Sequence, residues 1–143
     1  MVSISEPKLI PLFLEACPEF SERWREHVEY WGNEEAGSYN DLAELARFLL
    51  DSYESGNLET VTKALDLTER LLQEKDPQTV QLLTVGLIES LQITGSHRPF
   101  DNDDFVKLLG PASKQAWFEI EKVWDGKSTL MEVIRAEKKL NKT

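Results

Sequence analysis

Apolar residues recur at spacings of three and four along almost the whole chain, which is the pattern of amphipathic helices. The period-two alternation that is typical of strands is almost absent. We therefore predict an all-α fold of about eight helices joined by short loops. The expected helices are a short one before Cys17 and longer ones over residues 18–31, 41–54, 57–74, 76–94, 101–110, 111–124 and from Ser128 to Leu140.

These helices are expected to form one domain over residues 1–143, because the length suits a single domain and no linker interrupts it. The helix 57–74 is joined by short turns to 41–54 before it and 76–94 after it. Short turns favour antiparallel pairs like those of HEAT repeats. Since no sequence repeats at a fixed period, a single irregular bundle is favoured over a solenoid.

Residues typical of helix ends stand at several of the predicted boundaries. Asp76 followed by Pro77 is typical of a helix start, because the carboxylate caps free amides and proline fits the first turn. Asn57 is expected to cap the start of helix 57–74 with its side chain. Gly32 and Gly56 follow helices, where glycine ends them at little conformational cost.

The stretch LLGPASKQAWFEIEKVW, residues 108–124, places a Gly-Pro pair directly before a run with two tryptophans. We interpret Gly110 as the end of one helix and Pro111 as the start of the next. That second helix has an apolar face, on which the members are Ala116, Trp117, Ile120, Val123 and Trp124.

All four tryptophans fall on faces that are predicted to be buried. Helix 18–31 aligns Phe20, Trp24, Val28 and Trp31 on one face, with His27 beside it. Trp31 and Trp124 close their helices and could reach the surface, where a tryptophan can anchor a partner.

Helix 76–94 is apolar on two sides, which is typical of a helix packed between neighbours. At 100° per residue, Glu89 falls on the second side, near Leu82, Val85 and Ile93. A buried carboxylate without a partner would cost several kcal/mol, so an ion pair with a neighbouring helix is favoured. The alternative is that this side stays open for a partner. Gly86, in the same helix, indicates close helix packing.

The 16 basic and 26 acidic residues give a net charge of −10. Such a surface repels phosphate backbones and anionic lipid, so we expect no nucleic acid and no membrane as partner, and favour a basic protein. Residues 127–143 are locally basic, which suits the end of a last helix or an anion clamp. No basic leader precedes the first apolar stretch and Cys17 is the one cysteine, which together predict a cytoplasmic protein.

No residue pattern predicts a catalytic, cofactor or metal site. His27 and His97 have no partner at metal-binding spacing, and Cys17 has no neighbouring histidine. The run 101–104 resembles the opening of a calcium loop but lacks the required glycine and final glutamate. We therefore expect a protein that is not an enzyme and that needs no cofactor.

Acidic residues gather in two parts of the sequence, 33–51 and 101–104. Such runs are most often solvated faces, but they would form a docking patch for a basic partner if the fold brought them together. The predicted partner-binding residues are Trp31, Glu34, Glu35, Asp41, Glu44, Glu89, Asp101, Asp103, Asp104 and Trp124.

Three stretches, LFLEACPEF, TVQLLTVGLIESLQ and LLGPASKQAWFEIEKVW, resemble a family of small acidic helical bacterial proteins. The resemblance runs from about residue 9 to 124, and its LGPxSxxxW signal combines Gly110, Pro111, Ser113 and Trp117. Members of that family have no established enzymatic activity and are often met beside polymorphic toxins, where they are regarded as immunity proteins.

The resemblance implies a binding protein that neutralises a basic toxin domain by covering its active site or substrate surface. The family offers no catalytic residues that could be carried over to this chain. The alternative function is a helical scaffold or self-associating adaptor, with the apolar side near Glu89 as its interface.

Overall fold

The computed structural model describes residues 8–123, and every regular element in that range is helical. The elements are α1 (Ile10–Ala16), the 3₁₀ turn η1 (Pro18–Phe20), α2 (Ser21–Trp31), α3 (Ser38–Glu54), α4 (Leu58–Gln73), α5 (Pro77–Gln81), the π-helical segment η2 (Leu82–Ile88), α6 (Glu89–Gly95), α7 (Asn102–Val106) and a helix over residues 111–123. The predicted all-α class is therefore confirmed. The predicted helix from Ser128 lies outside the described residues.

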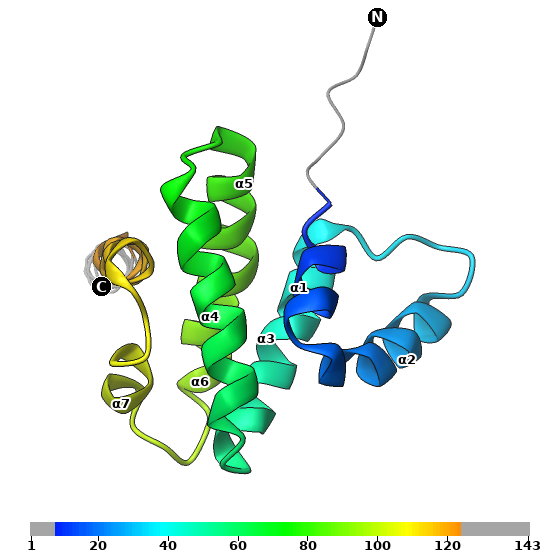
Figure 1. Ribbon diagram of the computed structural model, residues 1–143, viewed down its shortest axis with the longest axis horizontal. Coiled ribbons are helices and arrows are strands. Elements are labelled where there is room, and N and C mark those ends of the chain that lie inside the picture. The colour runs from blue at the N-terminus through cyan, green and yellow to red at the C-terminus, as the bar shows by residue number, and fades with distance from the viewer. Residues whose placement is uncertain (1–7, 124–143) are drawn as a thin grey trace, which may run out of the picture.

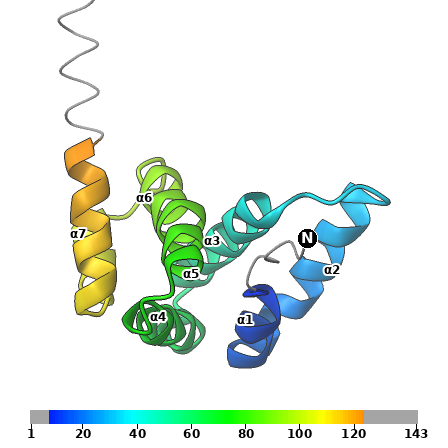
Figure 2. The ribbon, with the colours of Figure 1, turned by 90° about the horizontal axis from the view of Figure 1, so that it is seen from above.

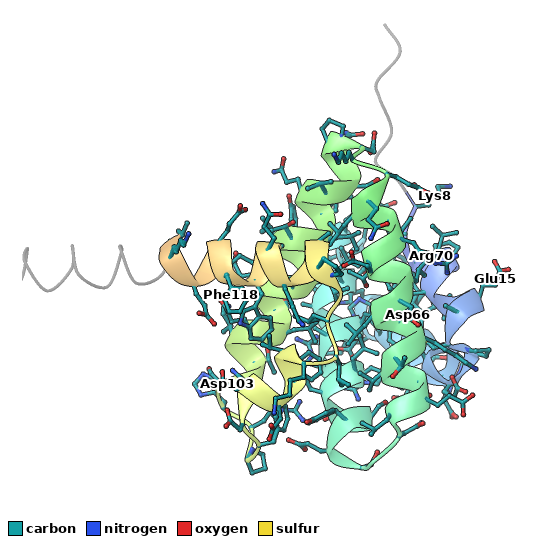
Figure 3. All side chains as sticks on the ribbon, turned by 60° about the vertical axis from the view of Figure 1, so that its left-hand side comes forward. Lys8, Glu15, Asp66, Arg70, Asp103 and Phe118 are labelled. Carbon is teal, nitrogen blue, oxygen red and sulfur yellow. The ribbon has the colours of Figure 1, made fainter. Side chains whose placement is uncertain are left out.

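The centre of the molecule is formed by α3 and the continuous helix α5–η2–α6, which pack along each other. Helices α1 and α2 lie on one side of this pair, and helix 111–123 lies on the opposite side (Figures 1 and 2). Helix 111–123 crosses the neighbouring helices instead of running along them (Figure 3). The predicted central place of segment 76–94 is thus confirmed.

The core is built from the apolar stripes that the sequence predicts. Leu42, Leu45, Leu49 and Leu50 of α3 are almost wholly buried, because their spacing puts them on the face turned to the other helices. Trp117 is 1% exposed and fills the space between helix 111–123 and the core.

Close contact between α3 and η2 depends on Gly86. A Cβ atom at this position would lie 2.7 Å from Cδ1 of Leu42, which is closer than packed carbon atoms approach. The prediction that Gly86 allows close packing is confirmed.

The second apolar side of this helix is only partly buried, which differs from the prediction. Leu82 is buried, but Val85 and Ile93 are each 43% exposed. The prediction assumed 100° per residue, whereas a π-helical turn contains more residues and shifts the positions that follow it.

Two predicted helix caps have different outcomes. Asp76 accepts a hydrogen bond from the amide of Thr79 at 3.0 Å, as expected for a capping carboxylate. Asn57 stands at the start of α4, but its side chain makes no capping hydrogen bond.

The Gly-Pro pair at 110–111 is explained by Glu69 of α4. The Glu69 carboxylate accepts hydrogen bonds from the amides of Ala112 and Ser113, at 3.0 and 2.9 Å, and from the Ser113 hydroxyl at 3.0 Å. Pro111 has no amide hydrogen that would need an acceptor. A Cβ atom at Gly110 would lie 2.5 Å from Cδ of Glu69, so only glycine leaves room for the carboxylate.

Burial disfavours the charged form of Glu69, but the hydrogen bonds from Ser113 and Ala112 outweigh it and hold the pKa of the carboxyl below its usual value. The stretch that carries the family resemblance therefore forms a helix start that is capped by a carboxylate distant in sequence. Val123, a member of its predicted apolar face, is 55% exposed and so differs from the prediction. Trp124, another predicted member, lies outside the described residues.

Candidate functional site

A hollow of about 430 Å³ lies where α2 ends and α3 begins. Gly32, with φ of 61°, ends α2 and lets the chain turn away from the helix. Loop 32–37 then leads into α3. The residues that line this α2–α3 hollow are Trp24, His27, Val28, Trp31, Gly32, Asn33, Glu34, Glu35, Ala36, Gly37, Ser38 and Asp41.

His27 forms the floor of the α2–α3 hollow. Its Nε2 lies 2.9 Å from Oδ1 of Asp41, and its side chain is 7% exposed. The rings of Trp24 and Trp31 lie on either side of it, with centroids at 5.3 and 6.4 Å. The contact between His27 and Asp41 joins α2 to α3, so it fixes the two tryptophans that wall the hollow.

A second hollow of about 310 Å³ lies beside the first. It is lined by Glu26, His27, Tyr30, Trp31, Asn40, Glu44 and Arg47. Trp31 and His27 line both hollows, so Trp31 stands between them as a common wall. Tyr30 packs edge-on against Trp31 at 6.0 Å and is 85% exposed. Tyrosine and tryptophan at the surface are enriched among the residues that contribute most of the binding energy of protein interfaces.

The predicted acidic residues divide into paired and unpaired groups. Asp41 binds His27, and Glu44 binds both Arg23 and Arg47. Glu34 and Glu35 are exposed at the rim of the α2–α3 hollow, and no ion pair to either is found within residues 8–123. Of the acidic residues that were predicted to bind a partner in this region, Glu34 and Glu35 are therefore the two without an ion pair among the described residues.

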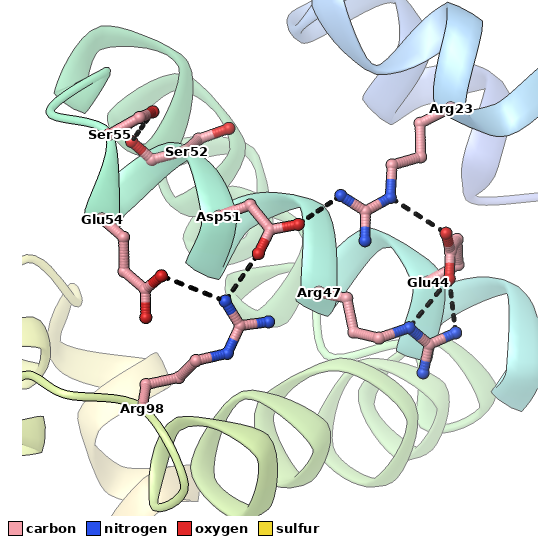
Figure 4. A network of polar contacts seen from close by, with 8 residues as sticks. All are labelled: Arg23, Glu44, Arg47, Asp51, Ser52, Glu54, Ser55 and Arg98. Atoms are coloured by element: carbon pink, nitrogen blue, oxygen red, sulfur yellow. Dashed lines mark hydrogen bonds and ion pairs between the residues drawn. The ribbon is translucent and has the colours of Figure 1, made fainter.

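A network of ion pairs runs along the outer face of α3 (Figure 4). Arg23 of α2 binds Glu44 and Asp51, and Arg98, after α6, binds Asp51 and Glu54. Burial disfavours ionisation of Glu44 and Asp51, but the hydrogen bonds from these arginines outweigh it and lower the pKa of both carboxyls. The network ties α2 and the segment after α6 to α3.

The acidic group 101–104 does not join the first group. Asp101 caps α7 by accepting a hydrogen bond from the amide of Asp103 at 2.9 Å, and Asp104 pairs with Lys107. Helix α7 lies on the side of the molecule opposite to α2 (Figures 1 and 2). The fold therefore separates Asp101, Asp103 and Asp104 from the α2–α3 hollow, and one continuous acidic patch is not formed.

Glu89 is partly exposed at the start of α6, on the side where Val85 and Ile93 are also exposed. The favoured ion pair with a neighbouring helix is not formed with any of residues 8–123. Glu89 therefore lies at an open, mixed apolar and acidic face.

A larger hollow of about 680 Å³ lies at the other end of α3. It is mostly apolar, and its lining residues are Tyr53, Glu54, Gly56, Leu58, Pro99, Phe100 and Leu108. Its one carboxylate, Glu54, already binds Arg98. This hollow offers apolar surface without free charge, whereas the α2–α3 hollow offers both aromatic surface and free charge.

The single cysteine is used within the fold. Cys17 is buried, its thiol donates to the carbonyl of Phe13, and burial, together with the charge of Glu19, raises its pKa to about 11 despite Lys63. Within the described part of the chain, no three histidine, cysteine or acidic residues are grouped as metal ligands. In the same part, no helix combines the length and apolar character that crossing a bilayer requires.

Sequence reasoning identified Trp31, Glu34, Glu35 and Asp41 but missed Tyr30 as a site residue. The signal was present, because two neighbouring aromatic residues stand directly before Gly32 at a helix end. Val28, predicted to be buried, is 48% exposed and lines the hollow, while His27 takes the buried position.

Comparison with known proteins gives one family and no individual relative. No curated protein and no solved structure matches the chain. The family described as Domain of unknown function (DUF7674) matches residues 10–125, close to the range over which the family resemblance was expected. Because this match spans most of the sequence, the chain belongs to that family of domains of unknown function.

Proposed function

We propose that this chain is a cytoplasmic binding protein, not an enzyme, and that it docks a basic protein partner at the α2–α3 hollow. The observation that carries the proposal is the exposed Tyr30 packed on the partly exposed Trp31, next to Glu34 and Glu35, which form no ion pair within residues 8–123. Following the family resemblance, the partner is a toxin domain, which the chain neutralises by covering its active site or substrate surface.

The physical support comes from the way interfaces are built. A few aromatic residues carry most of the binding energy of an interface, and Trp31 stands between two hollows that a partner's side chains can enter. Free carboxylates at the rim attract a basic surface and speed association.

The test starts with the tagged protein as bait in a lysate of its own source cell, washed at low and then at high salt. Two further baits are used in parallel, E34Q/E35Q and D103N/D104N. Both remove two negative charges from exposed positions, but only the first pair lines the hollow. Captured polypeptides are identified by mass spectrometry and then expressed with and without the protein.

The proposal expects a basic polypeptide that the wild type and D103N/D104N retain and that E34Q/E35Q loses. It also expects that this polypeptide is toxic when expressed alone and harmless together with the chain. A partner that all three baits retain equally contradicts the assignment to the hollow. A partner that is harmless when expressed alone contradicts the toxin-neutralising role and leaves a general adaptor.

A second candidate function is self-association, and it is favoured by the open face around Glu89. Val85 and Ile93 are exposed there, and Phe118 of the crossing helix is 49% exposed. Light scattering at increasing protein concentration distinguishes the two functions. A dimer that Val85→Ser or Ile93→Ser dissociates favours self-association, whereas a monomer at all concentrations removes it.

A further inference from the structure

We propose that the α2–α3 hollow is a binding site for an arginine side chain of the partner. This inference rests on the proposed docking function and assigns the chemical group that the hollow receives. It concerns the first hollow, walled by Trp24 and Trp31 and rimmed by Glu34 and Glu35.

The walls of the hollow suit a planar cation. Trp24 and Trp31 lie on either side of His27, so three aromatic rings meet at the floor and sides of one recess. Tryptophan is the aromatic residue that attracts cations best. A guanidinium group is flat and weakly hydrated, so it stacks on aromatic surface at a lower desolvation cost than an ammonium group.

The rim supplies the opposite charge. Glu34 and Glu35 are adjacent carboxylates on a short loop, and neither pairs with a cation within residues 8–123. Guanidinium presents its donors in a fork that matches carboxylate oxygens, whereas the ammonium group of lysine is a compact point charge. Aromatic walls and a carboxylate rim together therefore favour arginine over lysine.

The chain's own arginines near this end of the molecule are engaged elsewhere. Arg23 binds Glu44 and Asp51, Arg25 binds Glu29, and Arg47 binds Glu44. None of the three lines the α2–α3 hollow, although Arg47 lines its neighbour. Within residues 8–123, no arginine lines this hollow, and we infer that the partner supplies the guanidinium.

The experiment titrates the purified protein with blocked hexa-arginine and hexa-lysine peptides, followed by calorimetry and by the tryptophan indole NMR signals. Both peptides carry the same charge, so general attraction to the acidic surface affects both alike. We expect hexa-arginine to bind about tenfold more tightly and to shift the indole signals of Trp24 and Trp31.

Two variants locate the preference. In E34Q/E35Q and in Trp31→Leu, the ratio of the two affinities is expected to fall below about twofold, because one half of the recognition is removed in each. In D103N/D104N the ratio should stay near its wild-type value. E34Q/E35Q changes only exposed loop residues, so it remains informative if Trp31→Leu loses its fold by circular dichroism.

The outcomes separate this inference from the docking function on which it rests. Equal affinity for the two peptides, still lost in E34Q/E35Q, overturns the arginine site but leaves the docking of a basic partner standing. An arginine preference that survives both hollow variants places the site elsewhere and overturns the inference. Binding of neither peptide at low salt contradicts both.

Discussion

Two regions of this molecule place a carboxylate next to a helix end, and they use it in opposite ways. At the start of helix 111–123, Glu69 accepts three hydrogen bonds from Ala112 and Ser113 and lies against Gly110. At the end of α2, Glu34 and Glu35 lie exposed beside the aromatic α2–α3 hollow. The Glu69 carboxylate is used within the fold, whereas Glu34 and Glu35 form no ion pair within residues 8–123.

The comparison shows that net charge alone says little about where an acidic protein binds. The chain has a net charge of −10, yet Glu44, Asp51 and Glu69 are bound within the molecule. In the proposed function, the carboxylates that bind the partner are those that have no ion pair among the described residues and that lie beside a hollow. Removing each kind of carboxylate should therefore damage different properties.

The largest effect on stability is expected at the Glu69 cap. Glu69→Ala should lower the free energy of unfolding by about 2–3 kcal/mol, because two helix amides and a buried hydroxyl lose their acceptor. Urea unfolding followed by circular dichroism measures it. Asp66→Ala is the matched control, since Asp66 is an exposed acid on the same helix (Figure 3), and its change should stay within about 0.5 kcal/mol.

Gly110→Ala tests the same cap from the other side. Its Cβ would displace the Glu69 carboxylate, so this variant should also lower the free energy of unfolding. We expect the double variant G110A/E69A to lose little more stability than either single variant, since the two changes remove the same interaction. Fully additive losses would show that Gly110 is needed for a reason other than room for Glu69.

The largest effect on binding is expected at Trp31. Trp31→Leu should lower the affinity for the captured partner by about 30-fold, which is the loss typical of an aromatic residue at the centre of an interface. Calorimetry with wild type and variant measures it. Glu69→Gln provides the contrast, because it weakens a cap on another element and should leave partner affinity within about twofold. A loss in E69Q as large as in Trp31→Leu would contradict the separation of the two regions.

Acid should weaken the fold through the paired carboxylates. The pKa values of Glu44, Asp51 and Glu69 are lowered in the folded protein, so the unfolded state takes up protons first as the pH falls. The stability that these groups contribute is present at neutral pH and is lost as the pH drops below their ordinary values of 4.5 and 3.8.

Urea midpoints measured between neutral and acidic pH test this expectation. The wild-type midpoint should fall with pH in the acidic range, and the slope should be smaller in Glu69→Gln, which cannot take up that proton. An unchanged slope in the variant would show that Glu69 does not contribute to the acid response.

The fold was largely predictable from the sequence, because a helix is indicated by the spacing of apolar residues within one short segment and by the residues at its ends. Spacing of Leu42, Leu45 and Leu49 on α3 and the Asp76–Pro77 start were sufficient to place those helices. The π-helical segment was not predictable in this way, because the prediction used the regular α-helical spacing, and Val85 and Ile93 of that helix are exposed.

The site was only half predictable, for a physical reason. Residues near in sequence, such as Trp31, Glu34 and Glu35, could be grouped before the fold was known. Pairing between distant residues could not, and it decides which acids are free. Glu44 and Asp51 look like Glu34 in the sequence, but Arg23 and Arg98 bind them in the fold. Likewise, the sequence around Gly110 could not predict that Glu69, on another helix, caps the start of helix 111–123.

The smallest effects are expected in E34Q/E35Q and D103N/D104N. They test the comparison sharply, because the two variants should rank in one order for stability and in the opposite order for partner binding. E34Q/E35Q should leave the free energy of unfolding within about 0.5 kcal/mol, since these side chains have no partner within the described residues. D103N/D104N should lower it by about 0.3–1 kcal/mol, because both acids lie in the first turn of α7 and favour its dipole.

Partner binding should show the reverse order. In stopped-flow measurements, E34Q/E35Q should slow association several-fold and reduce its salt dependence, because the charge it removes stands at the docking hollow. D103N/D104N removes the same charge from the opposite side of the molecule (Figures 1 and 2), and salt screens the interaction of such remote charges with a partner at the hollow. Equal slowing by both pairs would mean that the whole acidic surface attracts the partner. Whether a carboxylate is paired within the fold would then not decide its contribution to binding.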